Sequence, residues 1–148
     1  MPVIVVGADT SLGSRIVEAM TGPEREIRAF VSDPDTADRF RERGVKVALG
    51  DVSDASHVGG ACTNCFSAVL VSDAASDGRP LAFATDADSV LRGWAEAVDG
   101  AAVRRAIWVV EGDPPPTPRV PESATVRRDM DPGEIVDAVV ALDEARAI

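Results

Sequence analysis

The chain lacks tyrosine altogether and has one lysine, Lys46, and one histidine, His57, among its 148 residues. This inventory excludes a mechanism built on a Tyr–Lys pair and a metal site with several histidine ligands. Long hydrophobic runs are missing too. None approaches the roughly 20 residues of a membrane helix, and no basic residue precedes the first apolar run, residues 3–6. We therefore expect neither a signal peptide nor a membrane anchor, and a cytoplasmic location.

Positive charge is scarce, with 15 Lys and Arg against 25 Asp and Glu and a formal net charge of −10. Direct binding of nucleic acid through bulk charge is therefore not expected. The two cysteines, Cys62 and Cys65, fall at the expected end of a helix, where the helix dipole disfavours a thiolate. With His57 and Asp54 they would form an unusual zinc ligand set. We interpret them as buried, reduced thiols and predict no metal site.

Apolar, β-branched runs alternate along the chain with apolar residues at helical spacing. The expected strands are residues 2–6, 27–31, 45–49, 67–71 and 106–110, with a possible sixth at 124–128. This alternation predicts one α/β domain, residues 1–148, with a doubly wound parallel sheet in three layers. We assume the strand order 3-2-1-4-5, with the possible sixth strand added. The ends of strands one, two and four then flank the usual ligand crevice of open α/β sheets.

The second half of the chain carries less regular signals. Residues 72–84 are expected to be a loop, and Thr85 with Asp88 resembles a capping box that opens the next helix. Five of the ten prolines lie within residues 111–122, which predicts an extended crossover over 111–123. The segment 131–134, Asp-Pro-Gly-Glu, is typical of a helix start.

A glycine-containing turn, residues 7–13, joins the first expected strand to the first helix. Gly7 permits a tight turn, and Gly13 lets the helix pack close to the strand. Free N–H groups and the helix dipole then face an anionic phosphate. No Gly-Lys-Ser/Thr follows, so a P-loop is excluded. Ser11 lacks a glycine two positions earlier, which excludes a nucleophile elbow.

Three segments in order, VIVVGADTSLG, IRAFVSDPDTADRFRERGVKVALGDVSD and CFSAVLV, resemble the NmrA-like, NAD(P)-binding group of atypical short-chain dehydrogenase/reductases. The resemblance covers roughly residues 1–110. It implies a Rossmann-like fold that binds a dinucleotide. The cofactor-binding positions it implies are Gly7, Thr10, Ser11, Leu12, Gly13, Ser32, Asp33, Asp51, Val52 and Ser72.

The chain departs from the family pattern at two of these positions. Thr10 stands where the family has its middle glycine, and its Cβ would crowd a pyrophosphate or its hydroxyl would donate to one. Ser32 replaces the arginine that often meets the 2′-phosphate of NADP. Asp33 lies 20 residues past Gly13, the right reach for a ribose 2′-hydroxyl, so we expect NAD rather than NADP. Asp33, which precedes a proline, is equally an ordinary helix cap. Arg28 or Arg39 stays open as a residue that would contact the 2′-phosphate of NADP.

The catalytic part of the family pattern is missing. Enzymes that this chain resembles usually carry Tyr-x-x-x-Lys on the helix that follows the fifth strand. Here residues 111–113, Glu-Gly-Asp, follow that strand and lead into the prolines. No catalytic residue is predicted, and the preferred hypothesis is a non-catalytic NAD(P) sensor or regulatory protein. One alternative is a small flavin or quinone reductase that works by proximity, with Glu111 or Asp73 orienting the acceptor. Another is an interaction domain that has lost its nucleotide site.

The proline-rich segment also bears on assembly. If it replaces a lost helix, it leaves one face of the sheet thinly covered. Exposed apolar surface favours association. We therefore predict a homodimer.

Overall fold

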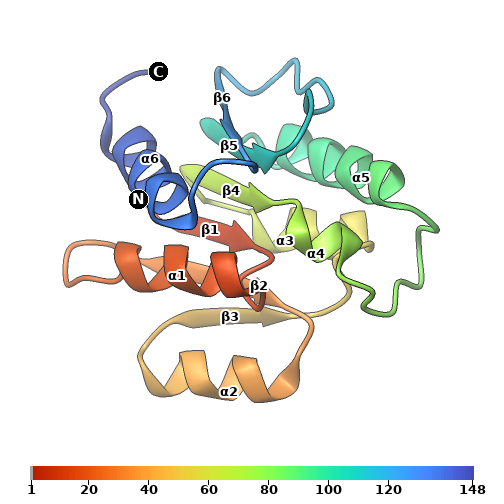
Figure 1. Ribbon diagram of the computed structural model, residues 1–148, viewed down its shortest axis with the longest axis horizontal. Helices are drawn as coiled ribbons and strands as arrows, with labels where there is room; N and C mark the ends of the chain where they lie inside the picture. The colour runs from red at the N-terminus through yellow and green to blue at the C-terminus, as the bar shows by residue number, and fades with distance from the viewer. Residues whose placement is uncertain (1) are drawn as a thin grey trace.

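Six parallel strands form one sheet in the order β3-β2-β1-β4-β5-β6, as the computed structural model, which describes residues 2–148, shows (Figure 1). The strands are β1 (Val3–Val6), β2 (Ile27–Val31), β3 (Lys46–Leu49), β4 (Ser67–Val71), β5 (Arg105–Val110) and β6 (Glu122–Arg127). The predicted order is confirmed, and the possible sixth strand exists and forms one edge. The direction of chain progression reverses between β1 and β4, so a crevice opens at the carboxyl ends of these two neighbours.

Helices cover both faces of the sheet (Figure 1). They are α1 (Ser11–Met20), α2 (Pro34–Glu42), α3 (Ala55–Ala61), α4 (Asp73–Ser76), α5 (Ala87–Gly100) and α6 (Pro132–Glu144). Alternate side chains of each strand point to opposite faces. Val3 and Val5 pack in a core with α1, α2 and α6, whereas Ile4 and Val6 pack in a second core with α3, α4 and α5. This explains why the strands read as continuous apolar runs.

Aspartate side chains cap most of these helices, and one cap differs from the expectation. Asp86, not Thr85, is the N-cap of α5, and its Oδ1 accepts from the backbone N–H of Ser89 at 2.7 Å. The expected loop 72–84 contains the one-turn helix α4. The predicted start of α6 is confirmed, with Asp131 as N-cap and Pro132 in the first turn.

The proline-rich segment between β5 and β6 contains no helix, includes a turn in which the Val120 N–H donates to the Thr117 carbonyl at 3.1 Å, and covers part of the sheet. Val120 is buried in the core that contains α5, and the backbone N–H of Arg119 donates to Asp99 Oδ1 at 2.7 Å. The large hydrophobic side chains exposed among residues 2–148 are Leu49, Phe83 and Ile148, which do not lie in this segment. The uncovered apolar face that motivated the homodimer is therefore not found there, and the homodimer stays a prediction. Across the same residues, no helix is long and apolar enough to cross a membrane.

Candidate functional site

The turn between β1 and α1 is closed so tightly that two of its positions require glycine. Gly7 has φ +86°, a conformation that L side chains rarely adopt. A Cβ at Gly13 would lie 2.0 Å from the carbonyl oxygen of Gly7. The turn therefore brings the start of α1 directly against the end of β1, as the sequence predicted.

Thr10 directs its side chain into this turn. Its Oγ1 donates to the carbonyl oxygen of Gly7 at 2.7 Å and accepts from the backbone N–H of Gly13 at 2.9 Å. Thr10 is 8% exposed, so its methyl and hydroxyl groups do not stand over the mouth of the turn. Thr10 is thus the N-cap of α1, and its effect on a pyrophosphate stays a prediction. Ser11 and Leu12 form the first turn of α1, whose N–H groups have no partner inside the helix; the Leu12 side chain is buried.

Asp33 caps α2. Its Oδ2 accepts from the hydroxyl of Thr36 at 2.6 Å and from the Thr36 backbone N–H at 3.1 Å. These bonds hold the pKa of the Asp33 carboxyl below its ordinary value. Of the two roles left open from the sequence, the structure shows the helix cap, which uses Oδ2, and the contact of Asp33 with a ribose stays a prediction.

Asp9, which the sequence analysis did not select, reaches the end of β2 instead. Its Oδ2 accepts from the backbone N–H groups of Ser32, at 2.8 Å, and Asp33, at 3.2 Å. Its side chain is 4% exposed and forms an ion pair with Arg79, Nη1 to Oδ1 2.9 Å. The sequence offered one signal for Asp9: it places a carboxylate inside a turn that is expected to face phosphate.

Arg79 comes from the segment between α4 and α5 and no local pattern pointed to it. Besides Asp9, its guanidinium contacts Asp77, with Nη2 to Oδ2 at 2.7 Å, and Ser32 Oγ, at 3.2 Å. Burial opposes the charge of Arg79, but the bonds to Asp77 and Asp9 outweigh it and raise its pKa. These side chains border a cavity of about 460 Å³, which is lined by Asp9, Ser32, Asp33, Pro34, Asp77, Gly78, Arg79 and Pro80.

Asp51 and Val52 follow β3, as expected, but both are held by the chain itself. Asp51 Oδ1 accepts from the hydroxyl of Ser53 at 2.6 Å, and Oδ2 accepts from the backbone N–H of Ala82 at 2.8 Å. Burial opposes ionisation of Asp51, but these bonds outweigh it and its pKa is lowered. Val52 is buried, and its carbonyl accepts from Trp94 Nε1. Residues 77–86 therefore lie against the residues that the resemblance assigns to the adenine.

Ser72 follows β4, and a second polar region begins with the residue after it. The next residue, Asp73, forms a two-point ion pair with Arg128, at 2.6 and 3.0 Å, which raises the pKa of Arg128. The pair borders a cavity of about 530 Å³ lined by Asp73, Ser76, Asp77, Glu111, Arg128, Asp129 and Met130. The reductase alternative named Glu111 or Asp73 as the residue that orients an acceptor, and both line this cavity; Arg128, just after β6, was not named.

The cysteines and the histidine take no part in either region. Cys62 and Cys65 are free and buried, and burial, with the nearby Cys65, raises the pKa of Cys62 to about 12. These thiols are therefore protonated at neutral pH, as predicted. His57 is exposed on α3 and packs edge-on against Phe30. Within residues 2–148 no group of three or more His, Cys, Asp or Glu side chains is placed to hold a metal ion.

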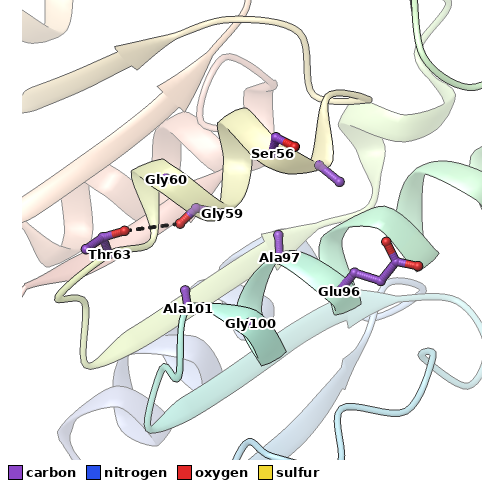
Figure 2. Close-up of a pocket in the computed structure, with 9 residues that line it drawn as sticks. Ser56, Gly59, Gly60, Thr63, Glu96, Ala97, Gly100 and Ala101 are labelled. Atoms are coloured by element: carbon purple, nitrogen blue, oxygen red, sulfur yellow. Dashed lines mark hydrogen bonds between the residues drawn. The ribbon is translucent and has the colours of Figure 1, made fainter.

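A further hollow, of about 380 Å³, lies between α3 and α5 (Figure 2). Small residues border it: Gly59 and Gly60 on α3 face Ala97 and Gly100 on α5. Glu96 stands at one end as its single charged residue. The hollow offers no convergent polar groups, and we assign it no function.

Comparison with known proteins agrees with this geometry. The NAD(P)H-binding family profile matches residues 7–133. No curated protein sequence matches the chain. Because the profile spans most of the chain, the protein belongs to this NAD(P)H-binding family. The resemblance drawn from the sequence is therefore confirmed at the level of an NAD(P)-binding Rossmann family.

Solved structures share the fold at low sequence identity. The NADPH-dependent quinone oxidoreductase QOR2 of Escherichia coli, complexed with NADPH, has TM-score 0.61 and 22% identity over 73% of this chain and 36% of its own. The triphenylmethane reductase of Citrobacter sp., complexed with NADP(H), has TM-score 0.61 and 20% identity over 74% and 37%. ChuY, an anaerobillin reductase from Escherichia coli O157:H7, has TM-score 0.72 and 18% identity over 99% and 92%. The chain thus spans just over a third of the first two proteins and nearly all of the third.

Proposed function

We propose that this protein is an NAD(P)H-dependent reductase that holds the dinucleotide and a small redox acceptor in contact. The observation that carries the proposal is the open cavity beside Asp73, Glu111 and Arg128, at the carboxyl ends of β4, β5 and β6. In sheets of this order the dinucleotide lies across the carboxyl ends of the strands. The cavity therefore adjoins the place where a nicotinamide bound beyond Ser72 would end.

The turn fits the pyrophosphate. The space that a Cβ at Gly13 would fill is taken by the Gly7 carbonyl group, so α1 starts as close to β1 as the backbone allows. The N–H groups of Ser11 and Leu12, at the positive end of the helix dipole, would then hold the phosphates. Asp51 Oδ2 accepts one bond, from the Ala82 N–H, and has acceptor capacity left for an adenine amino group.

The cofactor, when bound, supplies the hydride. The chain's own contribution is to position the acceptor and to exclude water. The Arg128 guanidinium is 31% exposed beside Asp73, so it has an edge free to donate to an acceptor oxygen that gains electron density. Glu111 lines the same cavity. No tyrosine is required for such a transfer.

The size of the similar structures supports this proposal. ChuY, an anaerobillin reductase, is matched over 92% of its length, so a chain of similar extent serves as a reductase on this fold. QOR2 and the triphenylmethane reductase extend well beyond the matched part. An acceptor site built from the Rossmann domain alone is therefore the simplest arrangement for this chain.

The test is oxidation of NADH and of NADPH, followed by nicotinamide absorbance, with FMN or menadione as acceptor. We expect turnover with one of these acceptors and a clear loss of turnover in Arg128→Met. Arg104→Met, an exposed arginine at the opposite end of the sheet, is the matched control and should keep full activity. Dinucleotide binding without turnover of either acceptor would contradict the reductase proposal.

That outcome would support the second candidate, a non-catalytic NAD(P) sensor. One observation favours it: residues 77–86 are tied to Asp9, Ser32, Asp51 and Ser53 by hydrogen bonds and an ion pair. Cofactor binding beside this segment would alter its attachment, and the change would be open to a partner. Homodimer formation, with or without dinucleotide, is tested in the same samples by light scattering.

A further inference from the structure

The end of β2 decides which dinucleotide a sheet of this kind accepts. An acidic side chain there accepts a hydrogen bond from the ribose 2′-hydroxyl of NAD, whereas a nearby arginine accommodates the 2′-phosphate of NADP. The sequence suggested Asp33 for the first role. In the structure the Asp33 carboxylate is bound to Thr36 as a helix cap.

The carboxylate of Asp9 lies at this place instead. It accepts both backbone N–H groups that follow β2, from Ser32 and Asp33. Those two groups are the ones that a 2′-phosphate would otherwise use. The Thr36 N–H and hydroxyl are taken by Asp33, so each of these donors already holds an anion of the chain itself.

Arg79 is the cation that could reverse this preference, and most of its N–H groups are engaged in the same way. Nε and Nη2 bond Asp77, and Nη1 bonds Asp9. Its side chain is 12% exposed. The remaining nearby cation, Arg39, is exposed on α2 and donates to Thr36 Oγ1 at 3.0 Å.

The balance of charge therefore opposes a second phosphate. The carboxylates of Asp9, Asp33 and Asp77 face the two guanidinium groups of Arg79 and Arg39. A 2′-phosphate would add more than one negative charge beside Asp9, with like-charge repulsion strengthened by burial. A 2′-hydroxyl carries no charge, so these carboxylates do not repel it.

We propose that Asp9, held by Arg79 and by the backbone after β2, is the residue that selects NAD(H) over NADP(H). The proposal rests on dinucleotide binding by this family and does not depend on whether the protein is a reductase or a sensor. It places the selecting carboxylate in the glycine turn and not at the end of β2. The expected preference for NAD(H) is opposite to the NADPH and NADP(H) bound in the similar structures.

The first test uses the wild-type chain and measures Kd for NADH and NADPH by calorimetry. We expect NADPH to bind at least about tenfold more weakly. The pair 5′-AMP and 2′,5′-ADP repeats the comparison at the adenosine end alone. Equal or tighter binding of NADPH overturns the proposal. Failure of all the dinucleotides to bind would instead overturn cofactor binding itself, which distinguishes the two failures.

The second test compares two variants that each remove one carboxylate charge. Asp9→Asn should bring the NADPH/NADH ratio of Kd values to within about threefold of unity, whereas Asp33→Asn, which removes an exposed carboxylate of the same cavity, should shift the ratio by less than about threefold. Thermal unfolding of both variants checks that they are folded. If Asp33→Asn changes the ratio and a folded Asp9→Asn does not, Asp33 is the selecting residue and the proposal is wrong. If Asp9→Asn does not fold, the wild-type ratio still decides.

Discussion

The two ends of the sheet each hold an arginine bound to carboxylates, yet they differ in what the arginine faces. At the amino end Arg105 is fully buried, and its guanidinium bonds Glu122 and the carbonyl groups of Leu142, Asp143 and Ala145 at the end of α6. At the carboxyl end Arg79 and Arg128 border open cavities. An arginine–carboxylate pair stabilises the fold where no cavity adjoins it. Where a cavity does adjoin it, the arginine can also contact a ligand.

The largest effect is expected at the amino end, from Arg105→Met. The substitution leaves the last carbonyl groups of α6 without their donor and removes the contact of the guanidinium with the Phe66 ring. Unfolding in urea should show a loss of about 3 kcal/mol. Arg104→Met, whose side chain is 59% exposed, should change stability by less than about 0.5 kcal/mol. Equal losses in the two variants would contradict a structural role specific to Arg105.

The next effect sharpens the role of the glycine turn at the carboxyl end. Gly13→Ala places a Cβ against the Gly7 carbonyl group and should cost about 2 kcal/mol. It should also weaken NAD(H) binding by more than about tenfold, because α1 must move away from β1. Gly60→Ala, a helix position with nothing within 4 Å of the added Cβ, should instead stabilise the protein by about 0.5–1 kcal/mol. Calorimetry measures the affinities, and undiminished binding by Gly13→Ala would be inconsistent with the site.

A substitution of Thr10 in the same turn is expected to have a smaller effect, with little change in cofactor affinity. Because its side chain points into the turn, Thr10→Gly should leave NAD(H) affinity within about threefold of wild type. Its stability should change by only a few tenths of a kcal/mol, since glycine is a tolerated N-cap, whereas Thr10→Val should cost about 1 kcal/mol. A large gain in affinity for Thr10→Gly would show that the side chain does crowd the cofactor.

The same contrast explains what could be predicted from the sequence. The strands β1, β2, β4 and β5 and the turn follow from local features: apolar runs buried on both faces, glycines at fixed offsets, and aspartates before helices. Asp9 and Arg79 are 70 residues apart in the chain, and Asp73 and Arg128 are 55 apart. No periodicity or spacing links such partners, so the ion pairs at the carboxyl end could not be foreseen.

The smallest expected effect is a change in pH dependence at Asp77. The side-chain bond from Arg79 lowers the pKa of Asp77, so this carboxylate adds stability above its unfolded pKa of about 3.9. That contribution disappears as the pH falls through the folded pKa. Asp77→Asn should therefore be less stable than wild type at pH 7, and the two urea midpoints should converge as the carboxylates protonate.

Two features limit the size of this effect. Asp77 is 36% exposed, so solvent screens the pair, and Arg79 keeps Asp9 as a second partner. Asp38→Asn, which removes an exposed carboxylate on α2, is the control for the loss of one negative charge. A difference between wild type and Asp77→Asn that stays constant from pH 7 to about pH 3 would mean that Arg79 gains nothing from Asp77. Arg79 would then be held by Asp9 alone, and its guanidinium would have donors left for a cofactor phosphate.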